Sequence, residues 1–227
     1  VYPSQTTGFR MRAEFRVWHD GDELDYVMFR PDDPKTPVPI KDFPIACQRI
    51  RELMPVLQER LKSDPVLRRK LFQVEFLGTL AGDTLLTLVY HRRLEADWEG
   101  AAGALANDLG VSLVGRSRRQ KVVIGKDHVE EVLSVHGEPY QYRQYEQAFT
   151  QPNAMINSRM IEWACRQAKA LDGDLLELYC GNGNFTLPLA RHFDQVIATE
   201  LAKSSIRAAR ENQQANGVDN LHLVRLS

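Results

Sequence analysis

A glycine-rich turn between an apolar strand and a helix is the part of this chain best suited to bind a ligand. Residues 175–185 read LLELYCGNGNF, with Gly181 and Gly183 in the turn. Glycines let a ligand approach the backbone closely. Glu200 follows at the end of the next apolar strand, 195–199, where a carboxylate can accept hydrogen bonds from a ribose diol. This order predicts a nucleotide-type cofactor site on an α/β sheet.

The details of the turn favour S-adenosylmethionine (SAM) over a dinucleotide. A pyrophosphate-binding turn has the pattern G-x-G-x-x-G, and no third glycine follows here at that spacing. We expect Glu177, at the end of the first strand, to lie near the methionine amino group of SAM or else to hold the turn. The ring of Tyr179 is expected either to cover the cofactor or to belong to the core. The alternative is that the whole turn is only a structural connection.

The cysteines do not offer a catalytic or metal-binding group. Cys47, Cys165 and Cys180 are odd in number and far apart, which is not the spacing of a disulfide framework or a zinc site. Cys180 lies beside the predicted cofactor site, but it has no histidine or basic neighbour in sequence to stabilise a thiolate. We interpret it as a packing residue. The six histidines show no ligand spacing, so no metal is expected.

The composition sets limits on compartment and partners. The chain has 227 residues, of which 43% are hydrophobic, and this fits one large or two small domains. It has no run of about 18 apolar residues that could span a membrane, and the unpaired cysteines favour a reducing compartment, so we expect a cytoplasmic protein. The net charge of -1 gives no general attraction to nucleic acid, so any such contact must come from local basic clusters.

Strand and helix patterns before residue 147 indicate an α+β domain. Residues 9–18 alternate between apolar and polar side chains, which predicts a half-buried strand. The segment 31–39 is expected to be a loop because it is rich in proline, and Pro55 is expected to kink or split its helix. Further strands and helices are expected at 24–29, 45–61, 71–77, 84–90, 95–109, 111–115 and 122–124. We therefore predict a compact first domain over residues 1–147.

Residues 148–227 have the pattern of an incomplete doubly wound sheet. Asn153 is a suitable N-cap for a helix, and strands are predicted at 175–178, 195–199 and 221–226 with helices between them. This is the first half of a Rossmann-like α/β domain. Such sheets are normally buried on both faces and closed by further strands, and the chain begins with valine rather than methionine. We therefore expect a fragment of a longer protein.

Three basic clusters in the first domain suggest contacts with RNA. They comprise Arg10, Arg12 and Arg16; Arg68, Arg69 and Lys70, closely followed by Phe72; and four cations between residues 116 and 121. Arginine binds phosphate, and an aromatic ring can stack on an unpaired base. A single cluster of this kind is usually a solvated surface. Three clusters in one small domain keep RNA binding open as a prediction.

Three segments of the chain resemble the RNA uracil-5-methyltransferases, in particular the bacterial tRNA enzymes. The segments are FRVWHDG at 15–21, AFTQPN at 148–153 and ELYCGNGNF at 177–185. The resemblance implies an RNA-recognition domain over 1–147 and the N-terminal half of a SAM-dependent methyltransferase domain over 148–227. It implies SAM contacts at Gln151, Tyr179, Asn184 and Glu200. It also implies an RNA contact at Phe72 and, more loosely, at Arg10 and Arg12.

The reaction that this resemblance implies is methylation of C5 of the T-loop uridine in tRNA, which forms ribothymidine. In that family a cysteine thiolate adds to C6 of a flipped-out uracil, C5 takes the methyl group of SAM, and a base removes the C5 proton. The family's segments that carry this cysteine and this base are absent here. We therefore expect no catalytic residue in this chain, no methylation by the chain alone, and a monomeric full-length protein.

Two other functions remain open from the sequence. The first is a SAM-dependent methyltransferase that acts on another substrate, such as rRNA. The second is a non-catalytic RNA-binding fragment in which the glycine turn is purely structural.

Overall fold

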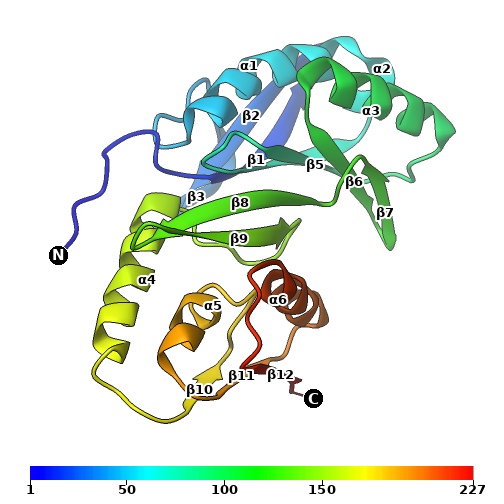
Figure 1. The fold of residues 1–227 in the computed structure, drawn as a ribbon. Helices are drawn as coiled ribbons and strands as arrows, with labels where there is room; N and C mark the ends of the chain where they lie inside the picture. Colours follow the sequence, from blue (N-terminus) through cyan, green and yellow to red (C-terminus); the bar gives the residue numbers. More distant parts are fainter. Residues whose placement is uncertain (227) are drawn as a thin grey trace. The chain divides into compact units, whose positions relative to one another are not determined.

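The computed structural model describes residues 1–226, which form two compact units (Figure 1). The N-terminal unit comprises Gln5–Gly78 and Gly82–Asp127, and the C-terminal unit comprises Val1–Ser4, Thr79–Ala81 and residues 128–226. The units separate near residue 127, because residues 128–147 belong with the C-terminal unit. The division of RNA recognition and cofactor binding at 147/148 stays a prediction.

The N-terminal unit is a seven-stranded sheet with the strand order β3-β2-β1-β4-β5-β6-β7. Neighbouring strands are antiparallel, except that β5 and β6 are parallel and are connected through the helix α3. The strands are β1 (Arg12–Asp20), β2 (Glu23–Arg30), β3 (Asp33–Pro39), β4 (Leu71–Gly78), β5 (Thr84–Tyr90), β6 (Ser112–Ser117) and β7 (Gln120–Ile124). The helices are α1 (Gln48–Ser63), α2 (Pro65–Arg68) and α3 (Ala96–Leu109).

The predicted alternation in β1 is confirmed. Phe15 is 1% exposed, while the neighbouring Glu14 and Arg16 are exposed. The ring of Phe15 lies 5.4 Å from that of Tyr26 and 6.2 Å from that of Phe76, centroid to centroid. The aromatic core therefore joins β1 to both of its neighbours, β2 and β4.

One prediction about proline was wrong, and of the two outcomes expected at Pro55 a split helix does not occur. Residues 33–39 form the strand β3 rather than a loop. Proline is tolerated there because β3 lies at the sheet edge. On the outer side of an edge strand there is no neighbouring strand, so a missing N–H costs no hydrogen bond between strands. The helix α1 also runs through Pro55 without being split. Pro55 and Arg51, whose carbonyl loses its partner, are both exposed, so water can bond that carbonyl.

The C-terminal unit contains the predicted alternation of strands and helices. Its parallel sheet has the order β10 (Leu175–Leu178), β11 (Val196–Glu200), β12 (Leu221–Arg225). The helices are α4 (Ala154–Ala168), α5 (Thr186–Leu189), continued by the 3-10 turn η1 (Ala190–His192), and α6 (Lys203–Ala215). On one face of this sheet, Val196 and Ala198 are fully buried, while Leu176, Leu178 and Ile197 on the other face are largely exposed.

A hairpin of β8 (His128–Val135) and β9 (Glu138–Tyr145) completes the C-terminal unit and was not predicted. Figure 1 shows β9 running alongside α6, and two asparagines fasten the strand, Asn212 within that helix and Asn216 at its C-cap. Asn216 accepts a hydrogen bond from the backbone N–H of Gln141 and donates one to its carbonyl. Asn212 bonds the backbone of Arg143 in the same way, although its donation to the carbonyl is long, 3.5 Å. The side chains thus replace a neighbouring strand at the edge of β9.

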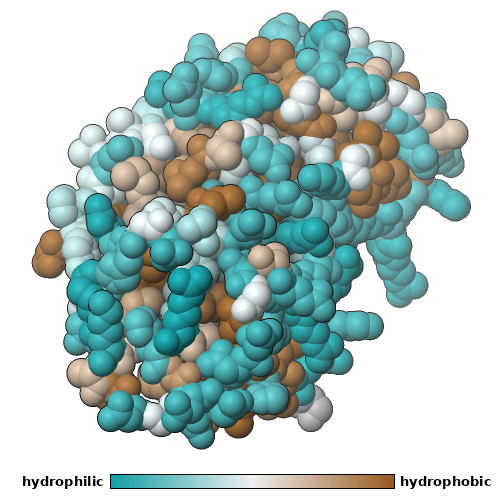
Figure 2. All heavy atoms as spheres, in the orientation of Figure 1, coloured by the Kyte–Doolittle hydropathy of each residue, from teal (hydrophilic) through white to brown (hydrophobic). Residues whose placement is uncertain are grey.

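Hydrophilic residues cover most of the face that Figure 2 displays, and hydrophobic residues come to that surface in separate patches. Within residues 1–226, no helix is long and apolar enough to cross a membrane.

Candidate functional site

The glycine turn after β10 has the open geometry that the sequence predicts. Gly181 and Gly183 both have positive φ, 59° and 85°. A Cβ placed on Gly181 would meet nothing within 4 Å, whereas one on Gly183 would lie 3.3 Å from Cγ of Leu187. Gly181 therefore faces open space, and Gly183 allows the turn to pack against the first turn of α5.

Glu200 lies at the carboxyl end of β11, beside this turn. One carboxylate oxygen accepts a hydrogen bond from the N–H of Gly181 at 3.0 Å. The other accepts from the N–H groups of Leu201 and Ala202 at 2.7 and 2.8 Å. A carboxylate offers about four lone-pair sites, so acceptor capacity remains on the oxygen that faces Gly181. The position fits a ligand for a ribose hydroxyl.

Glu177 connects the end of β10 to the helix that follows the turn. The Thr186 hydroxyl donates a hydrogen bond of 2.6 Å to its carboxylate. Burial raises the pKa of Glu177, and the bond from Thr186 partly opposes that shift. The side chain therefore holds the turn against α5, which is one of the two roles that the sequence allows.

The side chain of Asn184, at the end of the turn, is fixed by a reciprocal amide pair. Asn157 of α4 donates to Asn184 at 2.8 Å, and Asn184 donates back at 2.9 Å. The hydroxyl of Tyr142 in β9 also donates to the backbone carbonyl of Asn184 at 3.0 Å. Sequence reasoning missed Asn157 and Tyr142, because nothing in their local pattern shows that α4 and β9 meet the turn.

The remaining predicted cofactor residues lie around the same turn or precede α4. Tyr179 is 67% exposed and has positive φ, 59°, so its ring does not belong to the core. Gln151 is half-buried in the segment directly before α4. That helix carries Asn157, which is bonded to Asn184 of the turn.

Cys180 is held as a neutral thiol. Burial, together with the nearby carboxylates of Glu177 and Glu200, raises the pKa of Cys180 to about 12. Burial also raises the pKa of the Cys165 thiol, and Cys47 is buried. The interpretation of Cys180 as a packing residue rather than a nucleophile agrees with this environment.

In the N-terminal unit, Phe72 lies at a β-bulge and is stacked on both sides. The pairing of β4 with β5 jumps from Leu71 to Gln73, which leaves Phe72 as the extra residue. Its ring stacks on His91 with centroids 4.1 Å apart, and the guanidinium of Arg16 lies 3.9 Å from the ring centroid. A bulge redirects a side chain out of the regular pleat. The result is a cationic and aromatic cluster on the sheet, which we call the Phe72 stack.

The other predicted RNA contacts are more involved in local structure. Arg10 donates to the carbonyl of Arg12 at 2.8 Å, and Arg12 lies 3.6 Å from the buried carboxylate of Glu75. Arg68 donates to the carbonyl of Gly21 at 2.9 Å. Arg69 is exposed.

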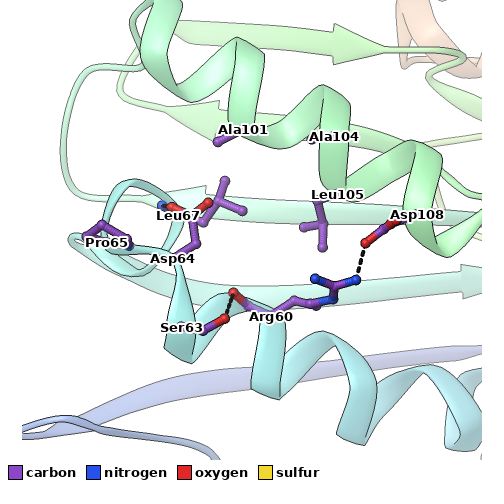
Figure 3. Close-up of a pocket in the computed structure, with 9 residues that line it drawn as sticks. All are labelled: Arg60, Ser63, Asp64, Pro65, Leu67, Ala101, Ala104, Leu105 and Asp108. Carbon is purple, nitrogen blue, oxygen red and sulfur yellow. Dashed lines mark hydrogen bonds and ion pairs between the residues drawn. The ribbon is translucent and has the colours of Figure 1, made fainter.

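A pocket of about 290 Å³ in the N-terminal unit offers no chemistry of its own (Figure 3). It lies where α1, α2 and α3 meet, and Figure 3 shows Arg60 turned toward Asp108, with which it forms an ion pair. Asp64 caps α2 by accepting from the N–H groups of Val66 and Leu67. Over residues 1–226, no group of three or more potential ligand side chains could hold a metal ion.

Comparisons with known proteins agree on one family. The family model described as tRNA (Uracil-5-)-methyltransferase matches residues 1–227. The chain is 52% identical over 227 residues to the tRNA/tmRNA (uracil-C(5))-methyltransferase of Aromatoleum aromaticum and 54% identical to that of Pseudomonas syringae pv. syringae. All of this chain is covered in both, but only 62% and 63% of the relatives, so the chain spans less than two thirds of their length.

A solved structure shares the fold. The Pyrococcus abyssi tRNA (uracil-54, C5)-methyltransferase, in complex with S-adenosyl-L-homocysteine, superposes with a TM-score of 0.75 at 18% sequence identity. The match covers 98% of this chain and 56% of that one. The predicted fold class is thereby confirmed, an α+β part followed by part of a Rossmann-like methyltransferase domain. On the match to its whole length, the chain belongs to the tRNA (uracil-5-)-methyltransferase family.

Proposed function

We propose that this chain supplies the SAM-binding turn and the RNA-recognition surface of an enzyme that methylates C5 of the T-loop uridine in tRNA. The observation that carries the proposal is the pairing of Glu200 with the open glycine turn at Gly181. Membership of the family and the names of its relatives support the choice of uridine and tRNA. Free cysteines and a tRNA substrate favour the cytoplasm as the place of action.

The cofactor side of this proposal rests on the turn. SAM supplies the methyl group when it is bound. Glu200 would accept hydrogen bonds from the ribose, and the backbone at Gly181 and Gly183 leaves room for the ligand. The exposed ring of Tyr179 would cover the cofactor. The remaining contacts proposed are Gln151, Asn184 and, through its carboxylate near the methionine end, Glu177.

The RNA side of the proposal rests on the Phe72 stack. Because Arg16 and His91 occupy the two faces of the Phe72 ring, an unpaired base would stack on the outer face of the guanidinium or of the imidazole, with the positive charge beside a phosphate. Arg69 is exposed and would add a phosphate contact. Arg10, Arg12 and Arg68 would act mainly by holding the strands and loops around this surface, since their guanidinium groups bond neighbouring backbone or carboxylate oxygens.

We do not propose any of the three cysteines of this chain as the nucleophile. A thiol with a pKa of about 12 is almost wholly protonated at neutral pH, and addition to C6 of uracil requires a thiolate. We propose that the cysteine and the base belong to the part of the relatives' length that this chain does not span.

Binding of a T-arm hairpin tests the proposed substrate. A fluorescein-labelled T-arm RNA is titrated with the chain and compared with the same stem carrying a loop in which cytidine replaces every uridine. We expect the T-loop to bind at least about fivefold more tightly, because cytosine exchanges the donor and acceptor groups of the uracil Watson–Crick edge, and loss of one hydrogen bond to that edge costs roughly 1 kcal/mol or more. Equal affinity for both loops would argue against the tRNA T-loop and in favour of another substrate.

A further inference from the structure

Two buried asparagines outside the glycine turn hold its two ends. The backbone carbonyl of Asn182 accepts a hydrogen bond of 3.0 Å from Asn212 of α6. The side chain of Asn184 is paired with Asn157 of α4. Asn212 is 1% exposed and Asn157 is 3% exposed, so water does not compete for these bonds. We propose that Asn157 and Asn212 are positioning residues for cofactor binding, an inference that rests on the proposed SAM site.

Asn157 acts through the orientation of Asn184. A carboxamide has two N–H donors and two acceptor lone pairs, and the reciprocal pair uses one of each on Asn184. One donor and one acceptor therefore remain, in directions that the Asn157 pair determines. Because one amide cannot turn over alone without setting two oxygens or two NH2 groups face to face, this pairing couples the orientation of Asn184 to that of Asn157 and fixes the plane of its amide.

Asn212 acts through the backbone of the turn. Its oxygen accepts from the N–H of Arg143 at 2.7 Å, while its nitrogen donates to Asn182. One side chain thus fastens both β9 and the residue between Gly181 and Gly183. Two glycines in three residues give this segment many alternative conformations, and an anchor between them restricts that freedom before the ligand arrives.

Asn216 provides a matched control on the same helix. Its oxygen accepts from the N–H of Gln141 at 2.9 Å, and its nitrogen donates to the Gln141 carbonyl at 2.7 Å. It therefore fastens β9 to α6 as Asn212 does, one helical turn later. None of its hydrogen bonds reaches the glycine turn. Replacing either asparagine by aspartate keeps the acceptor and removes the donor. The two variants differ in the bond to Asn182 and in the burial of the new carboxylate, since Asn212 is 1% exposed and Asn216 is half-buried, so each variant is referred to its own global stability.

Hydrogen exchange in the free chain tests the anchoring without a ligand. Amide exchange over residues 180–187 is compared among the unaltered chain, Asn157→Ala, Asn212→Asp and Asn216→Asp, with global stability measured by urea unfolding. We expect Asn157→Ala and Asn212→Asp to speed exchange in the turn about tenfold beyond their effect on global stability, as loss of a buried hydrogen bond would. Asn216→Asp should leave the turn unchanged.

Calorimetric titration with S-adenosylhomocysteine links the anchoring to the cofactor. Asn157→Ala and Asn212→Asp should bind S-adenosylhomocysteine about tenfold more weakly than the unaltered chain does. Asn216→Asp should bind it as tightly as the unaltered chain. The proposal is overturned if exchange in the turn does not change, or if Asn216→Asp changes exchange or affinity as much as Asn212→Asp. Failure of the unaltered chain to bind S-adenosylhomocysteine would instead contradict the proposed function, and the exchange data would still decide whether the turn is anchored.

Discussion

The carboxylate of Glu200 accepts a hydrogen bond from the backbone N–H of Gly181 at 3.0 Å. This bond joins the end of β11 to the turn after β10, so the acidic residue and the glycines that the sequence singles out form one site. The same carboxylate also accepts from the two backbone N–H groups that follow it. The carboxylate that we propose as the ribose ligand is therefore held in place by the chain's own backbone.

Replacement of Gly181 by alanine should reduce cofactor binding more than it reduces stability. The residue has φ of 59°, where a side chain costs about 1–2 kcal/mol, and its Cβ would enter the open space above the turn. Gly137→Ala, in the β8–β9 hairpin, is the matched control because its φ is 86° and its Cβ also meets nothing within 4 Å. Both variants should lose similar stability in urea unfolding, but only Gly181→Ala should weaken S-adenosylhomocysteine binding. Equal binding by both would place the ligand elsewhere.

Removal of the Phe72 ring should weaken RNA binding. Phe72→Ala takes away the ring that holds the His91 imidazole and the Arg16 guanidinium in place for a base, and loss of one stacked base costs about 1–3 kcal/mol. We expect T-arm affinity to fall by a factor on the order of ten, measured by fluorescence anisotropy. Phe29→Ala on β2 removes another partly exposed ring from the same sheet and should leave affinity unchanged. A similar loss in both variants would mean that Phe72 matters only for folding.

The Cys180 thiol should be unreactive in the folded chain. Its pKa of about 12 means that the thiolate is scarce from pH 7 to pH 9, where an ordinary cysteine becomes increasingly ionised. Mass spectrometry after brief treatment with iodoacetamide should therefore find Cys180 unmodified over this range, but modified after unfolding in urea. Rapid alkylation of Cys180 in the folded chain would reopen its assignment as a nucleophile.

Ionisation of Glu131 should destabilise the C-terminal unit as the pH rises. This side chain is 1% exposed and accepts hydrogen bonds from the N–H groups of Leu80 and Val132. Burial raises its pKa to about 7, which the two backbone bonds only partly oppose. The folded state therefore holds a proton that the unfolded state has released above about pH 4.5. The contribution of this proton to the free energy of unfolding is fully present below about pH 4.5 and is lost as the pH rises through 7.

Glu131→Gln isolates this effect because glutamine does not titrate. Between pH 5 and pH 8 the unaltered chain should lose about 2.5 kcal/mol of unfolding free energy relative to the variant, as a rise in the pKa of Glu131 from 4.5 to about 7 implies. Urea unfolding at four pH values measures the difference. A constant difference between the two proteins across this range would show that the carboxyl does not change its protonation.

Local patterns in the sequence predicted those parts of the fold that depend on a single element. The alternation around Phe15 predicted β1, and the glycine turn with Glu200 predicted the parallel strands and the position of the candidate site. The β8–β9 hairpin was missed although its residues also alternate, because the buried Glu131 stands where an apolar residue is expected. Its turn, His136 and Gly137, has positive φ at both residues, and the glycine is the part of this hairpin signal that the sequence did contain.

Contacts between distant segments could not be read from local patterns. Asn157 and Asn212 look like ordinary polar residues of amphipathic helices, and only the packing of α4 and α6 brings them to the turn. The bulge at Phe72 likewise depends on the register between β4 and β5. The strand β3 was missed because three of its seven residues are proline, and proline is accepted only since β3 lies at the edge of the sheet.

Calorimetric titration of this chain and its Glu200→Gln variant with S-adenosylhomocysteine tests the central claim most directly. Glutamine keeps one of the two oxygens that accept from the backbone N–H groups and replaces the other by an NH2 donor, and it also loses the charge that strengthens hydrogen bonds from a ribose diol. Glu138→Gln, an acid of the C-terminal unit outside the site, is the control. We predict one binding site in the unaltered chain and in Glu138→Gln, and binding at least about tenfold weaker in Glu200→Gln. Equal binding by all three proteins would contradict the assignment of Glu200 and the glycine turn as the cofactor site.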